Sequence, residues 1–549
     1  MAEDPDPVTR AELSTLLEAG DEAGLRDRFD HPLSFGTAGL RGPVGAGPGR
    51  MNQVVVRKTT AGLARYLVEQ AAPAGPSVVV GRDARHGSAM FADDAARVAA
   101  AGGERALRFE QPLPTPVTAF AVRHLGAAAG IMITASHNPA PDNGYKVYLG
   151  DGAQVIPPYD AEIAARAASA RVPGQADLFR PFGDLLADVG DADVLAAYRH
   201  AVLAVVDPGG PRRLRVTYSP LHGVGAAVLP ALLEEAGFEP PALVASQAAP
   251  DPDFPTAPFP NPEEPGVLGP ALADAERSRA DLVLVNDPDA DRLAVAVPDP
   301  AGRYRVLSGD ELGVLMADHL IATSTGADRL VATTVVSSSM LSALATQAGV
   351  AYVETLTGFK WIARAAGLRP GHRLLFGYEE ALGYAVCDAI ADKDGLSAAL
   401  VVADMAAGAK REGRSLLERL EDLESRLGVH STAQWSLRLA GSDAHRRMAA
   451  LMAHWRTAPP ARLAGLEVSE VRDLAQGLDG LPPSDVFVMR LGRAGRVVLR
   501  PSGTEPKLKV YFEATSGPTG LDGLAAARVA ARARLDELQR DVVGRLTAS

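Results

Sequence analysis

The chain has one cysteine, Cys387, among its 549 residues. A single cysteine excludes a disulfide within the chain and a cysteine-rich metal site. No apolar run is long enough to span a membrane, and the acidic first ten residues do not resemble a secretory leader. No basic stretch opposes the net charge of −12, which argues against nucleic acid as a main partner. We therefore expect a cytoplasmic protein that binds neither nucleic acid nor membranes.

The length and composition are typical of a globular protein with several domains. A chain of this length is too long for one hydrophobic core and should hold roughly three to five domains. Hydrophobic residues at 47% and charged residues at 22% can build such cores. Because acidic residues are in excess, an anionic ligand would need a few well-placed arginine and lysine side chains.

A short apolar run that ends in a polar, glycine- or proline-rich loop recurs along the chain, and a helical pattern usually follows it. The examples are residues 77–85, 130–139, 214–225, 329–340 and 373–384. Strands that alternate with helices predict βα units and largely parallel sheets. Ligands of such sheets bind beyond the carboxyl ends of the strands, where these loops would lie.

Composition also indicates the domain boundaries. Residues 205–213 (VVDPGGPRR) are typical of a linker, and a second break is expected near 322–328. After residue 428 the pattern changes to a mixed α+β tail that ends in a helical run. The proline-rich stretch 249–266 is expected to be a surface loop. We therefore predict four domains, at residues 1–207, 208–324, 325–428 and 429–549.

The stretch GIMITASHNP places a serine and a histidine directly after a strand-like run. Ser136 and Asn138 are common turn formers and Pro139 ends the strand, so loop geometry alone can explain them. The carboxyl end of a strand is also where chemistry is expected in a βα sheet. Ser136 is therefore a candidate nucleophile that the other motifs have to support.

Three aspartates, Asp287, Asp289 and Asp291, lie between two apolar runs in LVLVNDPDADRLAVAV. Alternate side chains of an extended or curled loop share a side, so three carboxylates can converge on one hard cation. Without a cation, carboxylates this close repel one another and raise one another's pKa. An all-oxygen set with too few ligands for a full cage predicts Mg²⁺.

Other interpretations of these loops fit less well. An EF-hand that starts at Asp287 needs glycine and glutamate where Arg292 and Pro298 stand. A phosphatase with an aspartate nucleophile leaves the third aspartate and the serine–histidine loop without roles, and it is kept as a distant alternative. GPVGAGPGR has Arg50 where a dinucleotide fingerprint needs its third glycine, and no Gly-Lys-Ser/Thr loop occurs.

The loop RPSGTEP carries an arginine, two hydroxyls and a glycine that lets backbone N–H groups approach a ligand: Arg500, Ser502, Gly503 and Thr504. This set suits a phosphate, and a plain hairpin loop explains it equally well. Further polar groups stand in FGTAGLRG, TLTGFKW and GYEEALGY, namely Arg41, Lys360, Glu379 and Glu380. Together the motifs supply a metal site, a nucleophile, a phosphate site and a carboxylate for sugar hydroxyls.

The chain resembles the α-D-phosphohexomutases, the superfamily of phosphoglucomutase and phosphomannomutase. TASHNP, DPDADR, GYEEALGY and RPSGTEP occur in the order of that family and span nearly the whole chain. FGTAGLRG, PDPDFPT, NPEE, TGFKW and DKDG look most like the branch with phosphopentomutases and some bacterial phosphoglucomutases. The resemblance implies four domains around a central cleft. The first three would be mixed α/β with largely parallel sheets, and the last would be a smaller α+β domain.

The resemblance also implies a role for each matching residue. Ser136 would carry the phosphate, and a phosphoserine oxygen with the three aspartates would hold one Mg²⁺. Acid–base candidates are His137, Lys146 and Lys360, and Arg41 and Arg292 would steady phosphoryl and sugar oxygens. The predicted substrate-binding groups are Arg292, Thr357, Gly358, Glu379, Arg500, Ser502, Gly503 and Thr504. A sugar bisphosphate would be both intermediate and activator.

Two departures from the family pattern concern the substrate. Ala381 stands where many hexose enzymes have the serine of Glu-x-Ser, and Phe359 stands where some bacterial enzymes have histidine. A missing hydrogen-bond donor weakens strict hexose recognition. We expect conversion of sugar 1-phosphate to 6-phosphate, with glucose first and mannose included, and pentose phosphates as the close alternative. A sugar-phosphate-binding relative without activity is a distant alternative, and the chain is expected to be a monomer or homodimer.

Overall fold

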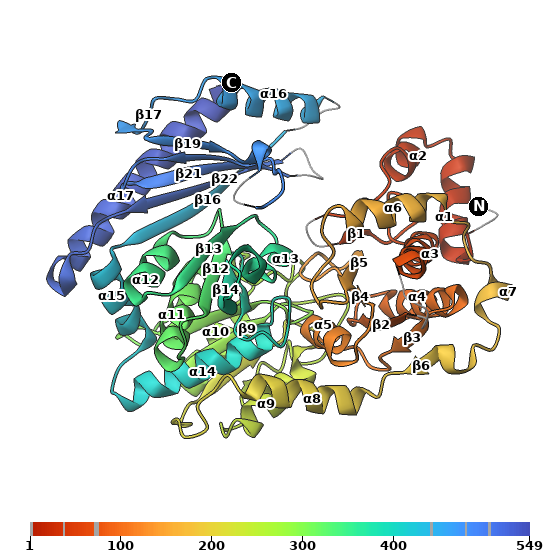
Figure 1. The fold of residues 1–549 in the computed structure, drawn as a ribbon, viewed down its shortest axis with the longest axis horizontal. Helices are drawn as coiled ribbons and strands as arrows, with labels where there is room; N and C mark the ends of the chain where they lie inside the picture. Colours follow the sequence, from red (N-terminus) through yellow and green to blue (C-terminus); the bar gives the residue numbers. More distant parts are fainter. Residues whose placement is uncertain are drawn as a thin grey trace. The chain divides into compact units, whose positions relative to one another are not determined.

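The computed structural model describes residues 4–36, 39–70, 76–439, 443–477, 480–502 and 507–548. The chain forms two compact units (Figure 1). The first comprises Met1–Gly309, Gly358–Arg364 and Ala381–Arg411, and the second comprises Asp310–Thr357, Ala365–Glu380 and Glu412–Ser549. No helix among the described residues has both the length and the apolar character needed to cross a membrane.

A six-stranded sheet in the order β1–β5–β4–β2–β3–β6 opens the first unit. Its strands are β1 (Leu40–Pro43), β2 (Ser77–Arg82), β3 (Arg105–Arg108), β4 (Ala129–Ile133), β5 (Asp142–Leu149) and β6 (Leu186–Asp188). Strands β4, β2, β3 and β6 are parallel, whereas β5 is antiparallel to both β4 and β1. The sheet is therefore largely parallel, as the sequence predicts.

Strand β4 is buried on both faces, which explains its continuous apolar sequence. Ile131 and Ile133 belong to a hydrophobic core shared with α3 (Gln53–Gln70), α4 (Ser88–Gly102) and α6 (Tyr159–Ser169). Met132 points to the other face, where its sulfur accepts a hydrogen bond from Thr118 of α5 (Thr115–His124). Packing on both faces fixes the point at which β4 ends, at Ile133, three residues before Ser136.

The second sheet of this unit has the order β11–β10–β9–β7–β8. Its strands are β7 (Val216–Ser219), β8 (Ala242–Leu243), β9 (Leu282–Asn286), β10 (Leu293–Pro298) and β11 (Tyr304–Val306). Strand β9 is parallel to β7 and antiparallel to β10, with Asn286 opposite Leu293. The three aspartates therefore lie in the tight connection of a β9–β10 hairpin, at the carboxyl end of β9.

The second unit holds a parallel sheet and an antiparallel sheet. Strands β12 (Arg329–Thr334), β13 (Ala351–Thr355) and β14 (Arg373–Glu379) are parallel, with β12 in the middle. The antiparallel sheet has the order β16–β22–β21–β20–β19. Its strands are β16 (His430–Arg438), β19 (Glu470–Asp473), β20 (Phe487–Arg490), β21 (Gly495–Pro501) and β22 (Lys507–Thr515), and α17 (Gly520–Ala548) packs on it. This α+β tail confirms the predicted change of character.

The other elements connect these sheets or cover them. In the first unit they are α1 (Pro7–Glu18), α2 (Glu22–Phe29), α7 (Gln175–Leu178), η1 (Gly183–Leu185), α8 (Asp191–Leu203), η2 (Gly225–Ala227), α9 (Leu229–Glu235), α10 (Gly269–Ser278), α13 (Phe359–Ile362), β15 (Gly383–Ala385) and α14 (Gly395–Arg411). In the second they are α11 (Gly309–Thr323), α12 (Met340–Ala348), η3 (Ala365–Leu368), α15 (Leu416–Leu427), α16 (Ala444–Thr457), β17 (Arg462–Leu463), β18 (Leu466–Glu467) and η4 (Leu474–Gln476). The proline-rich stretch 249–266 forms turns and coil, as expected.

Candidate active site

Ser136 lies in a strained turn just beyond the end of β4. Its φ of 52° is in the left-handed region, which residues other than glycine seldom adopt. The side chain of Thr134 stabilises the turn, because its Oγ1 accepts a hydrogen bond from Ser136 N at 2.8 Å. Only 1% of Ser136 is exposed. Non-glycine residues held in this region cluster at functional sites, so the turn has more than a chain-reversing role.

Arg85 holds the loop around Ser136 in place. From the loop after β2, its guanidinium donates to the carbonyl oxygens of Ser136 at 2.6 Å and of Asn138 at 2.5 Å, and also to those of Pro139 and Asp142. Asp83 lies 3.4 Å from the Arg85 Nε. Sequence reasoning missed this residue. A signal was present, since Arg85 follows β2, the parallel neighbour of β4, so both loops had to lie at one edge of the sheet.

The three aspartates of the β9–β10 hairpin form one buried cluster. One carboxylate oxygen from each of Asp287, Asp289 and Asp291 lies within 4.8 Å of the others. Each residue is at most 1% exposed. Asp289 Oδ1 and Asp291 Oδ1 have no hydrogen-bond partner in the part of the chain that the structure describes. Buried carboxylate oxygens without partners fit a hard divalent cation, so this cluster could bind Mg²⁺.

Lysine and threonine side chains complete the surroundings of the cluster. Lys146 Nζ on β5 donates to Asp289 Oδ2 at 2.8 Å and to Asp291 Oδ2 at 2.9 Å. Lys393 Nζ lies 3.2 Å from Asp291 Oδ2, and Thr115 Oγ1 donates to Asp289 Oδ2 at 2.6 Å. The sequence singled out only Lys146 among these three. The DKDG stretch pointed to Lys393 as part of a family pattern but gave it no role.

The serine loop and the aspartate hairpin meet at Ser136. Its Oγ donates to Asp287 Oδ2 at 2.7 Å, and His137 Nδ1 lies 3.1 Å from the same Oγ. Asp287 Oδ1 accepts from the backbone N–H of Arg292 at 3.0 Å, which orients the carboxylate. Residues about 150 positions apart in the chain, 136 and 287, thus share one site. The structure brings together the predicted nucleophile and the predicted metal ligands.

The protonation of the flanking groups follows from their neighbours. Burial, and then Arg292 and Arg41, hold the pKa of His137 well below its usual value, so the imidazole is neutral. Burial would lower the pKa of Lys146, but Asp289 and Asp291 outweigh it and raise that pKa. Lys146 therefore keeps its proton, and His137 is the group beside Ser136 that can accept one.

Two more predicted residues lie in this unit. The Arg41 side chain donates to Asn138 Oδ1 at 3.4 Å, which places it at the serine loop. Lys360 lies in α13, and burial lowers its pKa. Among the described residues it makes no hydrogen bond or ion pair with the aspartates, but Lys393 Nζ lies 5.5 Å from the centre of the ring of its neighbour Phe359. Arg41 therefore belongs to the cluster around Ser136, and Lys360 is connected to it only through neighbours.

The predicted sugar and phosphate groups are mostly in the second unit. Thr357, Glu379, Arg500 and Ser502 belong to it, Gly358 belongs to the first unit, and Gly503 and Thr504 lie outside the described residues. Thr357 Oγ1 is buried without a hydrogen-bond partner among the residues described. Burial raises the pKa of Tyr511 on β22; Glu380 and Glu379 raise it further, and a hydrogen bond with Arg500 opposes them. Arg500 and the Glu379–Glu380 turn therefore share surroundings.

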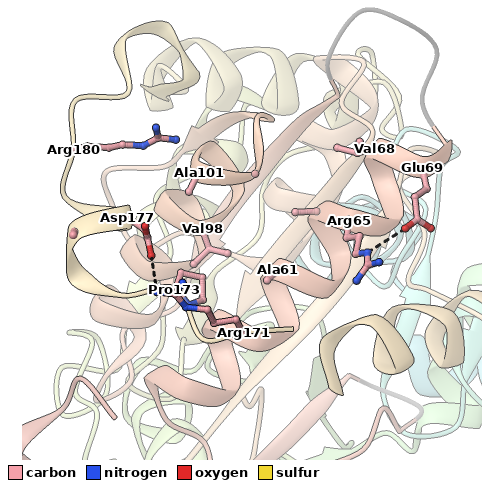
Figure 2. A pocket seen from close by; sticks show the side chains of 13 residues that line it. Ala61, Arg65, Val68, Glu69, Val98, Ala101, Arg171, Pro173, Asp177 and Arg180 are labelled. Carbon is pink, nitrogen blue, oxygen red and sulfur yellow. Dashed lines mark hydrogen bonds and ion pairs between the residues drawn. The ribbon is translucent and has the colours of Figure 1, made fainter. Parts of the chain in front are cut away.

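A cavity of about 690 Å³ elsewhere in the first unit involves none of the predicted residues (Figure 2). Helices α3 and α4 form its walls with small side chains such as Ala61 and Ala101, and Arg65, Arg171 and Arg180 border it. The arginines are partly engaged, since Arg65 Nε lies 3.2 Å from Glu69 Oε1 and Arg171 Nη2 lies 3.8 Å from Asp177 Oδ2. The chemistry-bearing groups gather at the aspartate cluster and not here.

Gly223→Ala is expected to disturb the aspartate hairpin. A Cβ at Gly223 would stand 2.2 Å from the carbonyl oxygen of Pro288 and 2.3 Å from its Cα, and backbone atoms cannot rotate away. We expect about 10-fold weaker Mg²⁺ binding in calorimetric titrations, the scale of losses caused by displaced supporting groups. Gly408→Ala is the control, because nothing lies within 4 Å of a Cβ there. Equal affinities of both variants would contradict the expectation.

Comparisons with known proteins place this chain in one class. Sequence models of phosphoglucomutase/phosphomannomutase match in order: α/β/α domain I at residues 32–172, domain II at 196–302, domain III at 308–426 and the C-terminal domain at 462–531. The chain is a phosphomutase, an isomerase that moves a phosphate group within its substrate. It belongs to the phosphoglucomutase/phosphomannomutase family, which is part of the α-D-phosphohexomutase superfamily.

Relatives with three different names resemble the chain along most of its length. A Haemophilus influenzae protein named "Probable phosphomannomutase" is 40% identical and aligns over 84% of this chain and 93% of its own. A mouse phosphopentomutase is 34% identical and aligns over 94% of this chain and 90% of its own. A Staphylococcus aureus phosphoglucomutase is 34% identical and aligns over 90% of this chain and 92% of its own. The solved structure of a Burkholderia thailandensis phosphoglucomutase/phosphomannomutase family protein shares the fold, with a TM-score of 0.71 and 20% identity. The match covers 94% of this chain and 97% of that one.

Proposed function

We propose that the chain interconverts the 1-phosphate and 6-phosphate of a hexose, with glucose first and mannose included, through a phosphoserine at Ser136. The observation that carries the proposal is the contact between Ser136 Oγ and Asp287 Oδ2 at 2.7 Å inside the buried aspartate cluster. A hydroxyl in a strained turn, beside a neutral histidine and three carboxylates, suits transfer of a phosphoryl group.

The residues around Ser136 have distinct roles in the proposed reaction. In the first transfer a sugar hydroxyl oxygen bonds to phosphorus as the bond from phosphorus to Ser136 Oγ breaks. In the second transfer Ser136 Oγ bonds to the phosphorus at the other position of the sugar, and the bond from that phosphorus to the sugar oxygen breaks. Neutral His137 can take or return the proton of the reacting hydroxyl. Lys146 keeps its charge beside Asp289 and Asp291, and Arg85 fixes the loop. Mg²⁺, held by the three aspartates and a phosphoserine oxygen, would offset negative charge on the transferred group.

The proposed substrate contacts are residues of the second unit and Gly358, which follows Thr357 in the chain. Thr357 and Gly358 would bind the sugar phosphate, Glu379 would accept hydrogen bonds from sugar hydroxyls, and the Arg500 loop would hold the phosphate that is not reacting. The Thr357 hydroxyl is buried without a hydrogen-bond partner among the described residues, and this supports the assignment. Arg41 and Arg292 would steady phosphoryl and sugar oxygens, and Lys360 stays an acid–base candidate.

Three wider proposals accompany this function. The four domains are proposed at 1–207, 208–324, 325–428 and 429–549, and the coil at residues 207–215 supports the first boundary. A sugar bisphosphate is the proposed activator, since it would phosphorylate Ser136. The proposed state of assembly is a monomer or homodimer.

A phosphopentomutase is the second candidate, and a specific observation favours it. The mouse phosphopentomutase aligns over 94% of this chain. Ala381 also removes the hydroxyl of the Glu-x-Ser pattern, which relaxes the requirement for a hexose hydroxyl at that position.

Turnover of four substrates tests the proposal. We expect kcat/KM for glucose 1-phosphate to exceed that for mannose, ribose and deoxyribose 1-phosphate, with about 10-fold or more between hexose and pentose if a bound hydroxyl discriminates. Each reaction is monitored through formation of the 6-phosphate or 5-phosphate product, with glucose 1,6-bisphosphate present. Higher kcat/KM for the pentose phosphates would replace the first candidate by the second. No turnover of any of the four would refute both.

A further inference from the structure

Ser337 makes an unusual double contact with the Glu379–Glu380 turn. It lies in the loop between β12 and α12 and is fully buried. Its Oγ donates to Glu380 Oε2 at 2.9 Å and accepts from Glu380 N at 3.2 Å. Thr334 Oγ1 lies 2.8 Å from the same hydroxyl. One serine hydroxyl thus holds both the backbone and the side chain of Glu380.

The backbone of Ser337 is tied to the antiparallel sheet of the same unit. Its carbonyl oxygen accepts a hydrogen bond from Arg496 Nη2 on β21. Arg496 is 4% exposed and also pairs with Glu513 at 2.9 Å and with Glu354 at 2.8 Å. Burial would raise the pKa of Glu513, but Arg496 and His430 outweigh it and hold that pKa well below the usual range. Arg496 is therefore fixed by charged partners on two sides, and it fixes Ser337 in turn.

Strand β21 connects this anchor to the proposed phosphate site. Arg496 stands opposite Glu513, and four residues later Arg500 stands opposite Lys509 in the same β21–β22 pairing. An extended strand of four residues spans about 13 Å without slack. A displacement of Ser337 would therefore shift the Glu380 turn on one side and the strand that carries Arg500 on the other.

We propose that Ser337 is a positioning residue that holds the sugar-binding turn in place against the phosphate-binding strand. The inference rests on the proposed function, in which Glu379 and Arg500 bind the substrate. The coupling runs from the Arg500 strand through Arg496 to the Ser337 carbonyl, and from the Ser337 hydroxyl to Glu380. It sets the distance between the hydroxyl-binding and phosphate-binding groups, which a substrate with both features requires.

Glu380 gives the coupling a measurable pH dependence. Burial, and then Glu379 and Asp310, raise the pKa of Glu380 to about 7, and the hydrogen bond from Ser337 opposes this shift. The groups that face it are the carboxylates of Glu379 and Asp310, with Tyr511 on β22 and Arg500 on β21. Above its pKa, Glu380 adds a negative charge next to groups that bind a phosphate, so substrate binding should weaken as the pH rises.

The test compares variants of Ser337 in the full-length enzyme. For Ser337→Ala we expect KM for the preferred sugar phosphate to rise about 10-fold, the scale of losing a hydrogen bond to a charged group, with kcat changed less than twofold. Ser337→Thr keeps the hydroxyl and should restore KM. Ser342→Ala, at the start of the same helix α12, is the control and should match the parent. Phosphate at Ser136, measured by mass spectrometry, should be the same in all four proteins.

Glu380→Gln provides a second measurement that does not depend on the folding of Ser337→Ala. The ratio of parent to variant KM should rise between pH 6 and pH 8, because only the parent gains a charge. A constant ratio, or a Ser337→Ala chain that folds with the KM of the control, would overturn the inference while the mutase activity stands. Absence of turnover in the parent would instead refute the proposed function.

Discussion

Replacing Ser136 with alanine is expected to lower kcat for every sugar phosphate by at least about 1,000-fold, since loss of a nucleophile costs this much or more in transfer enzymes. The Oγ is the only part of the side chain that alanine removes, and its contacts run to Asp287 and His137. The fold should persist, because Arg85 binds the backbone carbonyl of residue 136 and not its side chain. The measurement is turnover of glucose 1-phosphate with glucose 1,6-bisphosphate present.

Phosphate transfer to the protein separates loss of the nucleophile from general damage. Labelled sugar bisphosphate should phosphorylate the parent at residue 136 and leave the alanine variant unlabelled. Ser425→Ala is the matched control, since the Ser425 hydroxyl on α15 donates to the carbonyl oxygen of Asp422 and, among the described residues, forms no other hydrogen bond. An alanine variant with near-parent turnover, or with undiminished label, would end the phosphoserine assignment.

The sequence predicted the elements that carry the site because local patterns determine them. Apolar runs before residues 134, 287 and 379 became β4, β9 and β14, and the polar residues after them lie at strand ends. Alternation of three aspartates was enough to predict their convergence, because it depends on a few neighbouring residues. The contact of Ser136 with Asp287 was beyond local patterns, and only the family resemblance indicated it.

The groups that hold the site in place were harder to predict, since they act across long separations. Arg85 binds a loop 51 residues later in the chain, and Thr115 binds Asp289 from 174 residues away. Each contact depends on the packing of neighbouring strands, which sequence spacing does not encode. Lys146 was predicted as an acid–base candidate, and its two carboxylate partners favour its protonated form, which can donate a proton but not accept one. Its chemistry follows from contacts on β9–β10 that its own sequence neighbourhood does not reveal.

Asp289→Asn is expected to weaken Mg²⁺ binding by about 100-fold or more, since even groups next to a metal ligand contribute about 10–100-fold. The change keeps the shape of the side chain but removes one negative charge from a cluster in which Asp289 Oδ1 has no partner among the described residues. Lys146 would then face one carboxylate fewer, so the local charge becomes more positive and a cation is repelled. Affinity is measured by calorimetric titration of metal-free protein, and chelator should inhibit the parent reversibly.

Asp299→Asn is the control that isolates this effect from total charge. Asp299 follows directly after β10, the strand on the other side of the aspartate hairpin, and its carboxylate pairs with Arg303 in an exposed turn. Both variants lose one negative charge from a chain of net charge −12. Only the Asp289 variant loses it where three buried carboxylates converge, so only that variant should need a higher Mg²⁺ concentration for turnover. Full activity of thoroughly metal-free parent protein would show that the aspartates serve the fold alone, with Lys146 as their permanent counter-charge.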